Sequence, residues 1–371
     1  MPASALTIRE LNRATLARQL LLERETRSPE DALERLGGIQ AQLPQPPFAG
    51  LWSRLTAFEA DDLRQAYAKR EVVRATWIRG TLHTVTARDF LRFRAALQPM
   101  LSAGWEGIAR RRRGSTPLDF TAVLAAVTDF LAGGPRTFAE ISAFLASRCP
   151  EVDVGTMRYA ARMHLPMAQV PGDERWSFPG NPRFTLATEW LGRPIGPSGA
   201  GDIEELVMRY LGAFGPGTPA DMQTWSGMTG LAEAFERLRD RLVSYGGKRG
   251  AELFDMPGVP LPGADIAAPV RFLPEFDNLL LAHRDRKRVI ADEHRKAVYL
   301  PALRVAATVL VDGFVAATWS VERTKGGATL SVRPFEELSD GDRRAVTAEA
   351  ERLLGFIEPE ARTRVARVAP A

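Results

Sequence analysis

The chain has a single cysteine, Cys149, among its 371 residues, and it has no long hydrophobic run. One thiol forms neither an internal disulfide nor a cysteine-based metal cluster, and such scarcity is typical of a reducing compartment. No segment approaches the roughly 20 consecutive apolar residues of a membrane-spanning helix. The opening residues MPASALTIRELNR lack the apolar core of a signal peptide. These absences predict a cytoplasmic protein without membrane contact.

Several enzyme signatures are missing as well. The sequence has no Walker phosphate loop, no GxGxxG dinucleotide motif and no GxSxG nucleophile elbow, which disfavours the enzyme classes that those motifs mark. Its histidines are scattered, and none has a second histidine or a cysteine at the spacing of a metal site. We expect neither a metal ion nor another cofactor.

Lysine is scarce although the chain is basic, with a formal net charge of +4. The basic residues are nearly all arginines, and the lysines are Lys69, Lys248, Lys287, Lys296 and Lys325. Arginine binds phosphate in a bidentate manner and stacks on bases, so this bias is compatible with nucleic-acid binding. A GC-rich genome would produce the same bias through codon usage, so the composition alone does not decide between these origins.

Repeated helix-start patterns indicate tandem units in a chain long enough for about two to four domains. N-capping sequences at 7–10, 137–140 and 218–221 each begin a predicted helix. The second and third are followed by a turn, a longer helix and an extended Gly- or Pro-rich piece, which is the order of a winged helix-turn-helix. In the less regular first unit, residues 28–36 supply the turn and helix, and residues 74–85 supply the wing.

From about residue 265 onward, the sequence predicts strands. Segments 305–311, 314–321 and 328–332 predict an antiparallel β meander, with Asp312-Gly313 as a strong hairpin signal. Ser339 caps a predicted amphipathic helix over 340–354. The predicted fold class is α+β, with three tandem winged helix-turn-helix units followed by an antiparallel β-rich domain and its terminal helix. The expected units span residues 1–114, 115–200, 201–264 and 265–371.

Gln40 and Gln42 bracket one small residue just after a predicted helix stop. The helix over 29–36 begins at a serine cap and ends at Gly37-Gly38. The prolines at 44, 46 and 47 disfavour a new helix, so we expect both glutamines to be extended. Side chains two residues apart in an extended chain point to the same side. Two adjacent amides can hold a water molecule or a base edge between them.

Basic and polar segments are candidates for DNA contact. The run Arg110-Arg111-Arg112-Arg113 is interpreted as a phosphate clamp, or else as a solvated helix end whose cations suit the helix dipole. Arg79, Thr81 and His83 alternate and would share one face of a strand, either beside the glutamines or as an ordinary half-exposed face. A second basic cluster contains Arg284, Arg286, Lys287 and Arg288.

Glu275 and Asp277 form a carboxylate pair that could serve acid–base chemistry. We favour a structural interpretation. In it, Asp277 caps the helical segment that follows, and either acid pairs with a nearby arginine.

Four segments occur here in one order: Gln40-Ala41-Gln42, 79–83 (RGTLH), 274–277 (PEFD) and 311–319 (VDGFVAATW). Together they resemble the AlkZ/YcaQ family of bacterial winged-helix DNA glycosylases, and the resemblance covers nearly the whole chain. The family motif is glutamine, an apolar residue, then glutamine or aspartate. Because Gln42 ends the motif here, the chain is similar to the AlkZ branch.

The resemblance implies a C-terminal β-barrel, with the units curved around double-stranded DNA as a monomer in the bacterial cytoplasm. It also implies excision of bulky N7-alkylguanine adducts and unhooking of interstrand crosslinks, with Gln40 and Gln42 as the catalytic residues. An N7-alkylated guanine is already cationic, so it leaves the sugar without a protonating acid. The amides then need only to place a water near C1′ and tolerate positive charge on the sugar. The motif places no lysine or N-terminal amine for a Schiff base, so no lyase activity is expected.

A non-catalytic winged-helix transcriptional regulator is the alternative from another class. In such a protein the two glutamines would read adenine edges, with which glutamine pairs in a bidentate manner. Three units in one chain argue against the palindrome-binding dimer that such regulators usually form. A structural chromatin-like binder, with salt-sensitive binding and no activity, is a third alternative.

Overall fold

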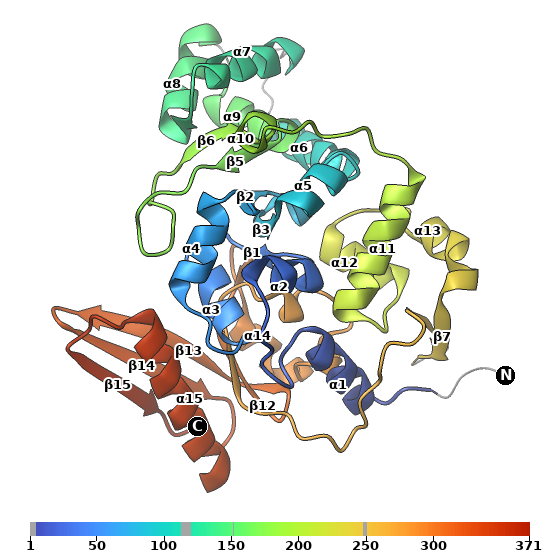
Figure 1. Ribbon diagram of the computed structural model, residues 1–371, viewed down its shortest axis with the longest axis vertical. Helices are drawn as coiled ribbons and strands as arrows, with labels where there is room; N and C mark the ends of the chain where they lie inside the picture. Colours follow the sequence, from blue (N-terminus) through green and yellow to red (C-terminus); the bar gives the residue numbers. More distant parts are fainter. Residues whose placement is uncertain (1–4, 113–119, 151, 248–250) are drawn as a thin grey trace.

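The computed structural model describes residues 5–112, 120–150, 152–247 and 251–371 (Figure 1). Its α-helices are α1 (Ile8–Arg18), α2 (Pro29–Leu36), α3 (Pro46–Trp52), α4 (Ala60–Ala68), α5 (Ala87–Phe93), α6 (Gln98–Arg112), α7 (Phe120–Ala132), α8 (Phe138–Arg148), α9 (Val154–His164), α10 (Ala187–Leu191), α11 (Ala200–Phe214), α12 (Pro219–Ser226), α13 (Ala232–Arg237), α14 (Arg295–Val298) and α15 (Asp340–Ile357). Short 3₁₀ turns are η1 (Ile78–Gly80), η2 (Arg239–Arg241), η4 (Asn278–Leu280), η5 (Arg286–Arg288) and η6 (Asp292–His294).

The strands form two larger sheets and two small ribbons. They are β1 (Ile39–Gln40), β2 (Val72–Thr76), β3 (Leu82–Thr86), β4 (Arg136–Thr137), β5 (Met167–Gln169), β6 (Arg183–Leu186), β7 (Val243–Gly246), β8 (Glu252–Asp255), β9 (Arg271–Leu273), β10 (Tyr299–Leu300), β11 (Arg304–Val305), β12 (Thr308–Val311), β13 (Phe314–Thr324), β14 (Gly327–Pro334) and β15 (Thr363–Val368). In Figure 1, α7 and α8 lie at the top, α11 to α13 at the right, and β13 to β15 with α15 at the lower left.

Local capping chemistry sets the predicted helix starts. Thr7, Thr137 and Thr218 each cap a helix through a reciprocal capping box with the acid three residues on, which confirms the three predicted starts. Helix α2 ends as expected at Gly37, whose φ of 68° is left-handed. The prolines at 44, 46 and 47 were expected to disfavour a new helix there, and this expectation is wrong, because α3 begins at Pro46. A proline in the first helical turn lacks only a donor that has no partner there, so it is tolerated.

One antiparallel sheet spans the expected boundary between the first two units. Its strand order is β1-β3-β2-β5-β6-β4, and β2 meets β5 at the pair Ala75 and Ala168. The largest hydrophobic core among the described residues also combines residues from the first three expected units. It contains Val73 and Phe90 from the first segment, Ala168 from the second and Trp225 from the third. The sheet that carries Gln40 is therefore braced by segments far away in the sequence.

The C-terminal strands form an open sheet, so the expected β-barrel is not confirmed for the residues that the structure describes. The order is β15-β14-β13-β12-β9, and neither edge strand pairs across to the other. The meander β12-β13-β14 is confirmed, with both Asp312 and Gly313 at positive φ in its hairpin. The chain then returns through α15, so β15 adds to β14 in parallel. Helix α15 packs against one face of the sheet and fills the core there.

Two buried ion pairs tie distant segments together. Arg54, which follows α3, makes a bidentate pair with Asp277 at 2.9 Å for both contacts, and both side chains are 1% exposed. Arg18 of α1 makes a similar pair with Asp255 of β8, at 2.6 and 2.7 Å. Asp277 also accepts from the backbone N–H of Leu279, as predicted for a cap. Among the described residues, no helix is long and apolar enough to cross a membrane.

Removing one partner of the Arg54–Asp277 pair should strongly destabilise the fold. We expect Asp277→Ala to lower the free energy of unfolding by about 3–5 kcal/mol, because it leaves a buried guanidinium without its counter-charge. The double variant Arg54→Met/Asp277→Leu should recover most of this loss. Urea unfolding measures both, with Arg64→Met as the control, because Arg64 pairs with Asp61 on the surface. A loss for Asp277→Ala no larger than that of the control would contradict this assignment.

Candidate active site

Gln40 is the last residue of a two-residue strand that the rest of the fold holds in place. Strand β1 pairs with β3 so that Gln40 lies opposite His83. Asn278 Nδ2 donates a hydrogen bond to the carbonyl of Gly38, just before the strand. Gly38 has φ of 85°, and a Cβ there would lie 2.6 Å from a methyl carbon of Val85. The glycine therefore permits the close approach that seats β1 against β3.

The side chain of Gln40 is buried and oriented by an arginine. Its Oε1 accepts from Arg79 Nη2 at 2.8 Å, and Arg79 also donates to the carbonyl of Trp225 in α12. A guanidinium only donates, so the oxygen of the Gln40 amide faces Arg79 and its NH₂ group faces away. Among the described residues, no group accepts a hydrogen bond from that NH₂. Gln40 is therefore fixed with a donor available.

Arg79, Thr81 and His83 do not lie along one strand, contrary to the expected alternation. Arg79 sits in η1 with φ of 55°, in the turn between β2 and β3, and only His83 belongs to β3. The turn still brings Arg79 and His83 together, with Nη2 and Nε2 3.5 Å apart. Thr81 donates to the carbonyl of Ile78 at 3.2 Å. The side chains of Gln40, Arg79 and His83 thus converge, as one of the two sequence interpretations expected.

Burial sets the protonation states of His83 and Arg79. Burial, together with the charge of Arg79, holds the pKa of His83 well below its ordinary value, so the imidazole is neutral. Its Nδ1 lies 3.2 Å from the carbonyl of Thr81, which can only accept, so Nδ1 carries the proton. Burial also lowers the pKa of Arg79 to about 10, with the charge of Arg286 adding to the effect. Arg79 therefore remains a cation at neutral pH.

Gln42 lies in a bend beyond the strand, with an exposed side chain. Its Oε1 is 3.4 Å from the backbone nitrogen of Leu82, a long contact that leaves the amide accessible. The expectation of two extended glutamines holds for Gln40, which is in β1, but Gln42 is outside any strand. One glutamine is therefore rigid and buried, and its neighbour two residues on is open to solvent.

Arg74 holds the backbone between the two glutamines, a role that the sequence interpretation missed. This residue of β2 is 4% exposed. Its Nε donates to the carbonyl of Ala41 at 2.9 Å, and its Nη2 donates to that of Gln42 at 3.2 Å. Its Nη1 donates to Oε1 of Gln169 in β5 at 2.6 Å. The sequence did carry a signal of this role, a lone arginine within the mostly apolar strand VVRAT, because a buried guanidinium needs several hydrogen-bond acceptors.

Of the two predicted basic clusters, the one at 284–288 lies near Arg79. Arg110, in α6, is exposed and pairs with Glu106 at 3.7 Å. The side chains of Arg111 and Arg112, and the whole of Arg113, lie outside the described residues. In the second cluster, the charge of Arg286 lies near enough to Arg79 to lower its pKa. The Arg286 guanidinium also stacks over the Tyr299 ring at 4.0 Å. Exposed members of this cluster are Arg284 and Lys287, and Lys287 pairs with Asp292 at 2.9 Å.

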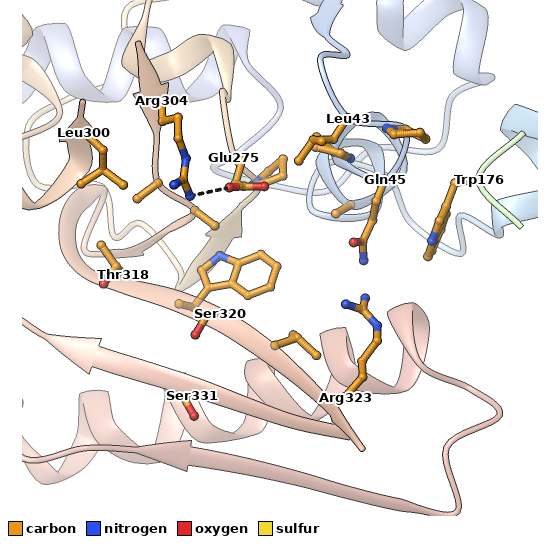
Figure 2. A pocket seen from close by; sticks show the side chains of 18 of the residues that line it. Leu43, Gln45, Trp176, Glu275, Leu300, Arg304, Thr318, Ser320, Arg323 and Ser331 are labelled. Carbon is orange, nitrogen blue, oxygen red and sulfur yellow. Dashed lines mark ion pairs between the residues drawn. The ribbon is translucent and has the colours of Figure 1, made fainter. Parts of the chain in front are cut away.

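The carboxylates Glu275 and Asp277 do not form a catalytic pair. Asp277 is committed to Arg54, as described above. Glu275 faces a cleft, where burial raises the pKa of its carboxyl and Arg304, at 4.0 Å, opposes that effect. Figure 2 shows the Glu275–Arg304 pair on the upper side of the cleft, across from the strands of the C-terminal sheet. In the parts of the chain that the structure describes, no three His, Cys, Asp or Glu side chains gather as metal ligands would.

The comparisons with known proteins concern DNA glycosylases. A family model described as "DNA glycosylase AlkZ-like" matches residues 33–356. A Streptomyces sahachiroi protein named "Interstrand DNA cross-link repair glycosylase" is 25% identical over 361 residues, which cover 90% of this chain and 92% of the relative. The solved structure of Streptomyces sahachiroi DNA glycosylase AlkZ matches with a TM-score of 0.80 at 22% identity, with 100% of both chains covered. This last likeness shows the mixed α+β fold.

Stability should fall at acid pH because His83 is buried in its neutral form. With the folded-state pKa lowered, the unfolded chain binds the extra proton below the ordinary histidine pKa of about 6.5. The stability that comes from burying neutral His83 is thus fully present above that pH. Below it, the free energy of unfolding falls by about 1.4 kcal/mol per pH unit. We expect His83→Gln to show a shallower decline in unfolding free energy from pH 7 to pH 5. His283, whose pKa burial lowers to about 3, should leave a residual slope in that variant. Equal slopes in the two proteins would refute a buried neutral His83.

Proposed function

Because the chain belongs to the AlkZ-like family of DNA glycosylases, we propose that it hydrolyses the N-glycosidic bond of N7-alkylguanine in duplex DNA. Unhooking of interstrand crosslinks is part of the proposal, since the curated relative carries cross-link repair in its name. The observation that carries it is the fixed polarity of Gln40 beside an accessible Gln42. These two neutral amides offer complementary hydrogen bonds to one water molecule.

Arg79 decides what each glutamine contributes. Since the oxygen of Gln40 is occupied by Arg79, its NH₂ donates to a lone pair of the attacking water. The exposed amide of Gln42 supplies a carbonyl that accepts a hydrogen bond from the same water, whose proton passes to solvent once the C1′–O bond has formed and the bonding pair has left with the base. Held in this way, the water is oriented towards C1′ without a change in the charge of either residue.

Neutral amides are sufficient only for a leaving group that is already activated. Alkylation at N7 gives guanine a positive charge, so the base departs without protonation, and positive charge builds up on the sugar. No lysine lies within the Gln40–Gln42 motif to attack C1′, so the product is an abasic site in an intact strand. The protein is accordingly proposed to be a monofunctional glycosylase.

DNA binding is proposed to use tandem winged helices in one monomeric chain. The order α7, β4, α8, α9, β5, β6 supports this for residues 115–200, because it is helix, strand, helix, helix and a strand pair. The proposed units are 1–114, 115–200, 201–264 and 265–371. The exposed candidates for phosphate contact are Arg110, Arg284 and Lys287. The proposed DNA contacts closer to the motif are Arg79, Thr81, His83 and Arg286. Such contacts position the duplex without reading its sequence.

Glutamate substitutions separate the two proposed glutamine roles. Gln40→Glu keeps an oxygen for Arg79 but removes the donor, so we expect base release to fall by at least about 100-fold. Gln42→Glu keeps the acceptor and should retain most of the activity, whereas Gln42→Ala should lose it. Chromatography of the free base released from a duplex that carries one N7-methylguanine measures the rate, after subtraction of spontaneous depurination.

The exposed glutamine Gln65 of α4 provides the control, since Gln65→Ala should release base at the wild-type rate. Full activity of the double variant Gln40→Ala/Gln42→Ala would overturn the catalytic assignment. Absence of base release by the wild-type protein, together with sequence-selective binding, would favour a regulator instead. A covalent protein–DNA complex trapped by borohydride would contradict the monofunctional mechanism.

Arg74 is proposed to be a positioning residue. Arg74→Met should lower kcat by about 10- to 100-fold with little change in KM, because the motif backbone loses its anchor while the DNA contacts remain. Arg74→Lys, which can reach only some of the same carbonyls, should be intermediate. Single-turnover kinetics over a range of protein concentrations separates the two constants. An equal effect on KM and kcat, or identical behaviour of the two variants, would argue for a merely structural role.

A further inference from the structure

Arg74, which holds the backbone of the glutamine motif, is itself held from another part of the chain. Its Nη1 donates to Oε1 of Gln169 at 2.6 Å. Gln169 is the last residue of β5 and is 4% exposed. Strand β5 belongs to the segment 115–200, and it meets β2 at the pair Ala75 and Ala168. This segment is therefore linked to the motif through the side chain of Gln169.

The guanidinium of Arg74 is a rigid plane with different partners on its two edges. Nε and Nη2 donate along one edge to the carbonyls of Ala41 and Gln42, at 2.9 and 3.2 Å. Nη1 points away from that edge and meets Gln169. Because the five N–H groups form a fixed planar fork, an acceptor that holds Nη1 also sets where the opposite edge points. Gln169 can therefore act on the motif through Arg74.

The face of the same guanidinium is covered by a second residue of the segment 115–200. The central guanidinium carbon of Arg74 lies 4.9 Å from the centre of the Phe178 ring. Phe178 is 4% exposed and packs edge-on against Tyr67 of α4, with ring centroids 4.9 Å apart. A cation over an aromatic face is attracted to it, and the attraction is stronger away from water. Gln169 and Phe178 thus restrain Arg74 in two directions, one within its plane and one perpendicular to it.

The loop between β5 and β6, which carries Phe178, is anchored to both ends of the chain. It lies beside α4 (Figure 1), where Arg64 donates to the carbonyl of Asp173 in the loop. Trp176 of the loop packs edge-on against a phenylalanine of α3, the next helix after the motif, with ring centroids 5.0 Å apart. Arg175 donates to a backbone carbonyl of α15 at 2.6 Å. The residues that restrain Arg74 are therefore supported by fixed structure.

The hydrogen-bond acceptors of Arg74 among the described residues are all neutral. A buried guanidinium without a carboxylate partner depends on each of these acceptors, because a buried donor left unpaired costs more than a typical hydrogen bond contributes. Loss of the Gln169 oxygen should therefore make the guanidinium rotate towards another acceptor. Its other edge would then lose alignment with the carbonyls of Ala41 and Gln42.

We propose that Gln169 is a positioning residue of the glycosylase, and that it keeps the motif backbone in place through Arg74. The inference rests on the proposed function, because the motif is the proposed site of base release. It gives the segment 115–200 a role in the rate of bond breaking, in addition to the DNA binding proposed above. Substitution of Gln169 would then slow base release without weakening DNA binding.

Two substitutions of Gln169 and one matched control test the proposal. Gln169→Met removes the acceptor and keeps the length of the side chain, whereas Gln169→Glu keeps an oxygen for Arg74. The control is Gln98→Met, because Oε1 of Gln98 accepts from Nη1 of Arg94, another buried arginine, at 2.7 Å. Arg94 also donates to the carbonyl of Met163 rather than to the motif. Single-turnover release of base from a duplex with one N7-methylguanine gives kcat and KM, and urea unfolding gives stability.

We expect Gln169→Met to lower kcat about 5- to 20-fold with KM within about twofold, and Gln169→Glu to stay within about threefold of the wild type. The double variant Arg74→Met/Gln169→Met should be no slower than Arg74→Met, because Gln169 then has no guanidinium to orient. Gln98→Met should keep the wild-type kcat although it destabilises the fold. Multiplied losses in the double variant, an equal loss in Gln98→Met, or a wild-type kcat in Gln169→Met would each overturn the proposal.

Amide hydrogen exchange tests the same link without any base release. The backbone N–H of Ala41 donates to the carbonyl of Leu82 at 2.7 Å, so its exchange reports on the motif. We expect faster exchange in the peptide 39–43 of Gln169→Met than in that of the wild type or of Gln98→Met. Equal exchange in the three proteins would overturn the proposal. If exchange differs as expected but the wild type releases no base, the proposed function fails while the link between Gln169 and the motif stands.

Discussion

The buried pair between Arg54 and Asp277 is the contact on which the geometry of the site depends. A charged pair that is 1% exposed on both sides is stable only if both partners stay in place, since either one alone would be a buried unpaired charge. Asp277 is followed by Asn278, which reaches the carbonyl of Gly38. The ion pair thereby fixes the turn that leads into Gln40, although Asp277 lies more than 200 residues further along the chain than Arg54.

The motif pairs directly with β3, where the backbone N–H of Ala41 donates to the carbonyl of Leu82 at 2.7 Å, and three side chains orient it further. Asn278 holds its beginning, Arg74 holds its backbone carbonyls, and Arg79 holds the side chain of Gln40. Two of these three groups are arginines that only donate, so each one fixes an oxygen and leaves the opposite side of the amide or peptide free. The polarity of the glutamine pair is thus a consequence of the cations behind it.

Local chemistry explains which parts of this arrangement could be predicted from the sequence. Capping boxes and the hairpin at Asp312 act over three or four residues, so their patterns are readable directly. Only one of the two sequence interpretations placed Arg79 and His83 beside the glutamines, and it assumed a strand, because a left-handed turn at Arg79 has no distinct sequence signal. The clamp by Arg74 and the open C-terminal sheet depend on pairings between distant strands. A β meander predicts neighbouring strands but does not determine whether its edges close.

The proposed chemistry of the two neutral amides limits how far they could discriminate between lesions. In the proposed reaction two neutral amides stabilise little charge, so the driving force would come from the positive charge of the N7-alkylated guanine. Under this proposal the two glutamines would not discriminate between adducts that are equally cationic. In the proposed function, selection among lesions would therefore come from residues outside the two glutamines, and the chain runs from Gln42 directly into a cleft that begins at Leu43. The lining includes Phe178, over whose ring Arg74 stacks at 4.9 Å, so the cleft and the arginine that anchors the motif backbone are physically linked.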